Sequence, residues 1–219
     1  MWCVGVLNAQ YRERMYDLLE LYARPLCRDE PVVCVDEKST QLLAHSRKPL
    51  PMQSGTPLRD DYEYVRNGTC NLFVAINAKA GRRTVMVTER RAKPDFVAFV
   101  RYLVERVYTS ARRIHLVVDN LNTHFRKCFD EVLGRRVATK LLKRVVFHYT
   151  PKHASWLNMA EIEIGVLTRQ CLDRRVTDMQ LLAQEVAAWQ NYRNLHRQTI
   201  EWTFTRQDAD RKLKCHYVA

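Results

Sequence analysis

Two aspartates in this sequence follow short apolar runs. Asp119 comes after Ile114–Val118, and Asp36 comes after Val32–Val35. Short β-branched runs are typical of strands buried on both faces, and a carboxylate at the end of such a strand costs free energy unless a partner offsets its desolvation. An aspartate at this position is commonly a turn former or a helix cap. A chemical role therefore requires further carboxylates at the same edge of the sheet.

Glu161 is a third candidate, on an apolar helical segment that follows the strand-like run Val145–Tyr149. Glu163 lies two positions further, about 200° around a helix, so the two glutamates cannot both face one site. Glu161 shares its side of the helix with Gly165, and a small residue there favours close packing against a sheet. We predict that Glu161 faces the two aspartates and that Glu163 does not.

Three carboxylates gathered at one end of a sheet would repel one another, and a divalent cation is the usual resolution. Mg²⁺ prefers oxygen ligands and keeps several waters, which leaves positions for phosphate oxygens. Two such ions can activate a water or a 3′-hydroxyl and stabilise the leaving oxygen of an in-line displacement. We therefore predict that Asp36, Asp119 and Glu161 bind Mg²⁺, with Mn²⁺ as a substitute.

The elements that must position these acids can be predicted in chain order. Val32 to Thr88 is expected to form an antiparallel meander with a tight turn at Asn67-Gly68. A helix starting at Pro94 then leads to the strand that ends at Asp119. The remaining elements are expected as helices over His124–Leu133, Val137–Arg144 and Met179–Leu195, with the strand Val145–Tyr149 and the Glu161 helix between them. This order predicts an α/β fold.

The composition favours a polyanionic partner. The chain has 219 residues, with 36 Lys and Arg against 24 Asp and Glu, for a net charge of +12. Nucleic acid is favoured over a membrane, because no apolar run is long enough to span one; a merely basic soluble protein is the alternative. Clusters such as Arg82-Arg83 and Lys140-Lys143-Arg144 are individually typical of solvated faces, and together are able to follow a phosphate backbone. Seven scattered cysteines without a CxxC pair indicate reduced thiols and a cytoplasmic location.

Three ordered blocks of sequence resemble the signature blocks of mariner-type transposases of bacterial insertion sequences, within the DDE superfamily. The resemblance covers nearly the entire chain. The blocks are Val35–Lys38, Val118–His124 and Tyr149–Glu161.

This resemblance implies a ribonuclease H-like fold, with a mixed five-stranded sheet flanked by helices, in which Asp36, Asp119 and Glu161 form the metal-binding catalytic triad. It further implies cleavage and strand transfer of double-stranded DNA by a homodimer, in a bacterial, nucleoid-associated protein. Two alternatives remain: a nuclease or resolvase that does not join DNA, and an inactive DNA-binding remnant. The expected divisions are a linker helix over 1–30, the catalytic domain over 31–197 and a basic tail over 198–219.

Two departures from the family pattern lead to further expectations. The interval between Asp119 and Glu161 is longer than in typical mariner relatives, and we assign the excess to a surface insertion over Gly134–Arg144. Such transposases carry helix-turn-helix modules before the catalytic domain, and no segment upstream of Pro31 is predicted to form one. We therefore expect a truncated or split copy.

Overall fold

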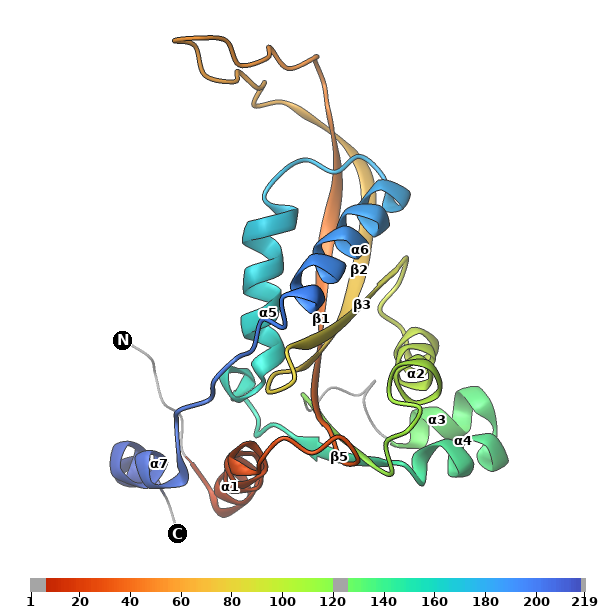
Figure 1. The fold of residues 1–219 in the computed structure, drawn as a ribbon, viewed down its shortest axis with the longest axis vertical. Coiled ribbons are helices and arrows are strands. Elements are labelled where there is room, and N and C mark those ends of the chain that lie inside the picture. The colour runs from red at the N-terminus through yellow and green to blue at the C-terminus, as the bar shows by residue number, and fades with distance from the viewer. Residues whose placement is uncertain (1–6, 120–125, 218–219) are drawn as a thin grey trace.

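Five strands form one mixed sheet in the order β3-β2-β1-β4-β5 (Figure 1). The structure is a computed structural model that describes residues 7–119 and 126–217. β1, β2 and β3 are antiparallel neighbours, and β4 and β5 run parallel to β1. This arrangement confirms the predicted mixed five-stranded α/β sheet. The strands are β1 (Val32–His45), β2 (Tyr64–Asn77), β3 (Arg82–Thr88), β4 (Ile114–Val118) and β5 (Val145–Tyr149).

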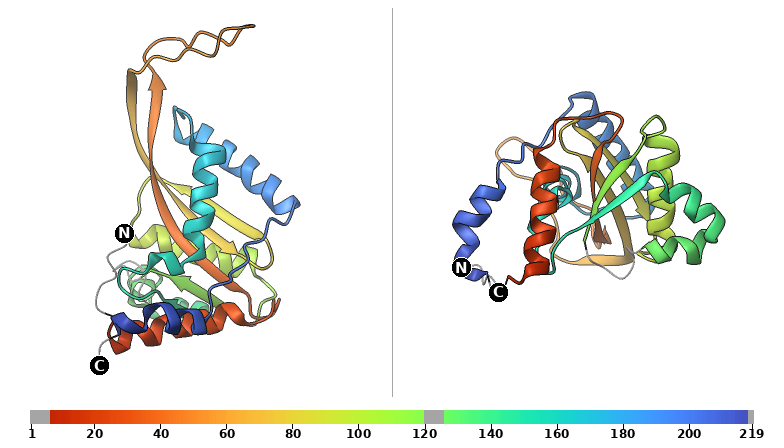
Figure 2. Two further views of the ribbon diagram at one scale, coloured as in Figure 1. Left: turned by 90° about the vertical axis from the view of Figure 1, so that its left-hand side faces the viewer. Right: turned by 90° about the horizontal axis from the view of Figure 1, so that it is seen from below.

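Helices cover both faces of the sheet (Figures 1 and 2). One face carries α2, α3 and α4, and the other carries α1, α5 and α6. α2 and α5 each continue into a π-helical turn, and a 3-10 turn precedes α5. The helices are α1 (Ala9–Ala23), α2 (Lys93–Tyr102), α3 (Arg126–Leu133), α4 (Arg135–Leu142), α5 (Met159–Leu167), α6 (Met179–Leu195) and α7 (Arg206–Leu213).

The core between the sheet and α2, α3 and α4 corrects one expectation. Val33 and Val35 of β1 pack here with phenylalanines of α2 and α3. Three side chains of α4 are also buried in this cluster: Ala138, Leu141 and Leu142. The segment assigned to a surface insertion therefore contributes to the core, because the apolar face of α4 covers the β4–β5 edge of the sheet.

The opposite face joins the two ends of the described chain. Cys34 of β1 and Val117 of β4 are buried here with the apolar face of α1. Trp202 and Phe204, which follow α6, pack against the same cluster, and α7 lies beside α1 (Figure 2). Residues from all three expected segments of the chain therefore share one hydrophobic cluster.

A chain of polar contacts also fixes α1 on this face. The Nδ1 atom of His148 on β5 lies 2.6 Å from a carboxylate oxygen of Asp17 on α1. The Nε2 atom of His148 lies 2.9 Å from Nδ1 of His115 on β4. Both histidines are buried. They therefore act as structural links between the helix and the parallel half of the sheet.

The β1–β2 hairpin is longer than predicted, and its arm extends well beyond the helices (Figure 1). Asn67 and Gly68 lie inside β2 and do not form the predicted tight turn. The register shifts here, with Gln41 opposite Thr69 and Leu43 opposite Arg66, so β2 holds one extra residue. Gly68 has a φ of 107°, a conformation that suits a β-bulge as well as it suits a turn.

Several side-chain expectations are resolved by burial. Four cysteines, Cys34, Cys70, Cys128 and Cys171, are buried free thiols, whereas Cys27 and Cys215 are exposed.

Two basic residues expected on solvated faces are instead bonded inside the protein. Arg83 is 1% exposed, and Arg144 donates to backbone carbonyls that include those of Tyr108 and Ala111, both at 2.6 Å. Across the described residues, no helix combines the length and apolar character needed to cross a membrane.

Candidate active site

Asp36 and Asp119 each lie two residues beyond the last pair between the two central parallel strands, β1 and β4. Cys34 of β1 pairs with Val117 of β4, and continuing this parallel register by two residues aligns Asp36 with Asp119. Because side chains alternate along a strand, both aspartates lie on the face that carries Cys34 and Val117. Asp36 is 8% exposed and Asp119 is half-buried.

Asn158 anchors the start of α5 beside these aspartates. Its Oδ1 accepts the backbone N–H of Ala160 at 3.2 Å, which caps the helix. Its Nδ2 donates to the carbonyl oxygen of Val35 at 2.9 Å, and its side chain is fully buried. The first turn of α5 is thereby tied to the residue before Asp36. Glu161 lies in this turn and is exposed to solvent.

The pKa of Asp36 responds to the charges of the other two acids. Burial raises the pKa of Asp36 to about 8, while the Glu37 backbone N–H, 2.8 Å from Oδ1, opposes that rise. The negative charges of Glu161 and Asp119 raise this pKa further. Asp119, after the last residue of β4, and Glu161, in the first turn of α5, therefore both lie within electrostatic range of Asp36.

Glu163 points away from this group and is held in a buried ion-pair cluster. Its Oε1 accepts from Nε of Arg83 at 2.8 Å and from Nε of Arg193 at 2.9 Å. Oε2 accepts from Nη2 of Arg193 at 3.3 Å. The carboxylate has no exposed surface. Two cations from β3 and α6 already balance its charge, so it is unsuited to bind a further ion.

The packing reason given for Glu161 over Glu163 was wrong. Among the described residues, a Cβ added to Gly165 would have only the guanidinium of Arg169 within 4 Å, at 3.7 Å, and no atom of the sheet. The rotation of α5 is fixed instead by Asn158 at its start and by the two arginines around Glu163. Asparagine is a preferred N-cap residue, so the sequence alone makes Asn158 a candidate cap. The sequence carried no signal for Arg83 and Arg193, which are distant along the chain.

The donor set fits a hard divalent cation, although the side chains do not already form a coordination shell. Within residues 7–119 and 126–217, no three His, Cys, Asp or Glu side chains are arranged to hold a metal ion. Carboxylate oxygens are nevertheless the ligands that Mg²⁺ and Mn²⁺ prefer, and Asp36 lies within range of the charges of Asp119 and Glu161. The rest of the second sequence block, including His124, and the predicted start of its helix lie outside the described residues.

Comparison with solved structures identifies the fold. The structure of the Mos1 mariner paired end complex with Mn superposes with a TM-score of 0.53 at 15% identity, covering 90% of this chain and 62% of that chain. The Mos1 Strand Transfer Complex gives 0.56 at 14% identity, covering 86% and 57%. The mariner Mos1 paired end complex with Mg gives 0.53 at 14% identity, covering 100% and 66%. The protein thus has the ribonuclease H-like fold of this transposase and spans about three fifths of its length.

The family comparison agrees with the three sequence blocks. No curated protein matches the sequence. Residues 31–182 match the family described as DDE superfamily endonuclease. This match covers more than half of the chain and contains Asp36, Asp119 and Glu161. The chain therefore belongs to the DDE superfamily of endonucleases.

Proposed function

We propose that this protein cleaves double-stranded DNA and joins the freed 3′ ends to target DNA, with Asp36, Asp119 and Glu161 holding two divalent cations. The observation that supports the proposal is the placement of Asp36 within range of the charges of Asp119 and Glu161, in a chain of the DDE endonuclease family. The net charge of +12 supports a nucleic-acid substrate. Mos1 has been solved with Mn and with Mg, which supports these ions as the cofactors.

Each acid has a distinct physical task in the proposed site. Asp36 lies on the central strand β1, and its buried carboxyl would have to lose its proton to ligate a cation. Asp119 approaches from the neighbouring strand, and the exposed Glu161 on α5 moves with little packing to disturb. When bound, the cations activate the attacking oxygen and stabilise the leaving oxygen. In cleavage water attacks phosphorus and a P–O bond breaks; in joining a 3′-hydroxyl replaces water.

Nicking of supercoiled plasmid DNA in Mg²⁺ or Mn²⁺ tests the catalytic assignment. We expect Asp119→Asn to lower the rate on the order of 10²–10³-fold or more, the scale seen when a group that stabilises the transition state is removed. The matched control is Asp130→Asn, an exposed aspartate on α3, which should leave the rate unchanged. Equal nicking by Asp119→Asn and the unmodified protein would refute the proposal.

Strand transfer needs a separate experiment because a nuclease of this fold would also pass the nicking test. Duplexes carrying the inverted repeats that flank the encoding element, already cut at their 3′ ends, are incubated with plasmid and Mn²⁺. We expect covalently joined product that depends on Asp119. Nicking without joined product would favour the nuclease alternative, and absence of both would favour the inactive remnant.

The partners follow from the same proposal. The neighbouring Mos1 structures are described as paired end complexes, and we propose that two copies of this chain likewise assemble on double-stranded DNA. Sedimentation or light scattering of the protein with and without its inverted-repeat duplex tests this assembly. A single copy per duplex at saturation contradicts it.

A further inference from the structure

A cavity lies at the end of the sheet opposite the acids. Its volume is about 560 Å³, and its walls include Pro31, Ala111 and Asn77. Pro31 and Ala111 precede β1 and β4, whereas Asp119 follows the last residue of β4 and Asp36 lies four residues into β1. The five residues of β4 span roughly 16 Å at the usual rise per residue of a strand. A phosphate in this cavity is therefore not one that the acids are cutting.

The cavity is lined by four basic residues from three separate parts of the chain: Arg28, Lys79, Arg82 and Arg197. Among the described residues that line it, none is acidic, and Ser110 and Thr199 add hydroxyl groups. Asn194 also lines the cavity, and its side chain is hydrogen-bonded to the backbone of Arg83. A cavity beside α1 differs in this respect, because Glu13 and Asp17 line it together with a single arginine. The cavity lined by the four basic residues thus combines four positive charges with hydrogen-bonding side chains.

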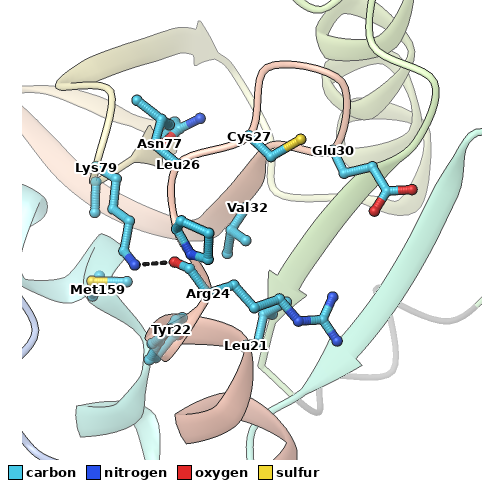
Figure 3. Close-up of a pocket in the computed structure, with 12 residues that line it drawn as sticks. Leu21, Tyr22, Arg24, Leu26, Cys27, Glu30, Val32, Asn77, Lys79 and Met159 are labelled. Atoms are coloured by element: carbon cyan, nitrogen blue, oxygen red, sulfur yellow. Dashed lines mark hydrogen bonds between the residues drawn. The ribbon is translucent and has the colours of Figure 1, made fainter.

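Two of these cations are held by specific contacts. The guanidinium of Arg82 lies over the ring of Tyr108, 5.3 Å from its centroid. Lys79 donates to the backbone carbonyl of Arg24, as Figure 3 shows at the wall shared with a smaller neighbouring cavity. The ammonium retains two further protons for an anion. Both cations are therefore placed at the wall before any ligand arrives.

The backbone at Arg197 is fixed against the β2–β3 turn. Arg197 has a φ of 45°, which is unusual for a residue with a side chain. A Cβ added to Gly81 would lie 2.5 Å from its carbonyl carbon, so the close approach requires glycine there. Ile200 also donates to the carbonyl of Ala78 at 3.1 Å. These contacts join the segment after α6 to the sheet and hold Arg197 at the cavity.

We propose that this cavity binds the phosphodiester backbone of a DNA segment other than the one being cut. Phosphate contacts by Arg, Lys, Asn, Ser and Thr side chains position a duplex without reading its sequence. Four cations without a carboxylate supply the electrostatic part of such binding. Only the choice of DNA as the polyanion rests on the proposed function; the anion site itself rests on the lining residues.

Fluorescence anisotropy of a labelled duplex, in EDTA to prevent cleavage, measures this contribution. The test variant combines Arg82→Glu with Arg197→Glu. The control combines Arg136→Glu with Lys140→Glu, which makes the same charge change on exposed positions of α4. We expect the test variant to raise the dissociation constant at least about ten-fold more than the control. It should also reduce the slope of log affinity against log salt by about two, the value for two lost phosphate contacts.

Equal loss of affinity in the two variants would overturn the proposal, because it would reflect net charge alone. If charge reversal lowers the melting temperature, the pair Arg82→Gln and Arg197→Gln is measured against Arg136→Gln and Lys140→Gln, with a smaller difference in the same direction expected. Labelled ATP forms a separate arm. Binding of ATP that the test variant abolishes, without a change in DNA affinity, would assign the cavity to free nucleotides and also overturn the proposal.

The outcome is separable from the proposed function. Failure of Asp119→Asn to affect plasmid nicking refutes the catalytic assignment and leaves the anisotropy result standing. Conversely, unchanged DNA affinity in the cavity variants refutes the second DNA site and leaves catalysis standing.

Discussion

Two glutamates on the same helix, two residues apart, lie in opposite electrostatic environments. Glu163 is fully buried and accepts from two arginines. Glu161 is exposed, and its charge raises the pKa of a neighbouring aspartate. A carboxylate paired with cations of the protein contributes to the fold, whereas one placed among other carboxylates is balanced only by an ion from outside. The contrast separates the structural acid of α5 from the proposed catalytic one.

Replacing each glutamate with glutamine tests this contrast and should give the largest difference between the two residues. Glu163→Gln leaves Arg83 and Arg193 as uncompensated buried charges, so we expect the free energy of unfolding to fall by about 3–5 kcal/mol. Glu161→Gln removes a repulsive charge near Asp36 and should leave stability unchanged or slightly higher. Urea denaturation followed by circular dichroism measures both.

Plasmid nicking supplies the converse measurement. At a temperature where both variants are folded, Glu161→Gln should lose activity and Glu163→Gln should retain most of it. If Glu163→Gln instead abolished nicking while Glu161→Gln remained active, the two roles would have to be exchanged.

The parts of this contrast that sequence patterns predicted are those set by local chemistry. Apolar β-branched runs located the β4 and β5 strands, and they placed Asp119 at the end of one of them. Asn158 before α5 belongs to a residue type that favours helix caps, so its capping role also depends on local chemistry. The clamp on Glu163 could not be predicted, since Arg83 and Arg193 lie on elements that only the folded sheet brings together. The pattern of apolar and polar residues in Arg82–Thr88 does not indicate which acid pairs with Arg83.

The turn chemistry of Asn67-Gly68 was recognised but assigned to the wrong structure. A glycine with positive φ serves a hairpin turn and a β-bulge equally well, and only pairing with β1 decides between them. The long arm that results was therefore not predicted. The fold at the acids did not depend on it, because Asp36 lies before the bulge.

Divalent cations should stabilise the protein in a pH-dependent manner. The pKa of Asp36 in the folded protein is raised to about 8, which is above its value in the unfolded chain. Its protonated form therefore stabilises the metal-free fold at low pH, and this contribution to stability is lost as the pH rises toward 8. A cation must displace the Asp36 proton, so its affinity rises over the same range. At a Mn²⁺ concentration about 100 times the dissociation constant at pH 8, we expect stabilisation of about 2.7 kcal/mol. The stabilisation by Mn²⁺ decreases by up to about 1.4 kcal/mol for each pH unit below pH 8.

Thermal melting with and without Mn²⁺ at several pH values measures this increment, and Asp36→Asn is the matched variant. Asparagine has no proton to displace, so its smaller increment should not vary with pH over this range. An increment in the unmodified protein that is constant from pH 6 to 8 would show that Asp36 does not bind the ion.

Two asparagine caps allow the smallest effect to be resolved. Asn8 caps α1 by accepting from the backbone N–H of Tyr11 at 2.8 Å, in an exposed position. Asn158 caps α5 in the same way and also donates to the carbonyl of Val35 from a fully buried site. We expect Asn8→Ala to cost about 1 kcal/mol. Asn158→Ala should cost about 1–2 kcal/mol more, because a buried carbonyl loses its donor.

The same pair tests whether Asn158 positions Glu161 as well as stabilising the fold. Releasing the start of α5 from Val35 lets Glu161 move relative to Asp36, so Asn158→Ala should weaken Mn²⁺ binding measured by calorimetry, whereas Asn8→Ala should not. If the two variants lowered stability by different amounts but bound Mn²⁺ equally, the hydrogen bond to Val35 would serve folding alone. The placement of Glu161 would then depend on the ion-paired Glu163.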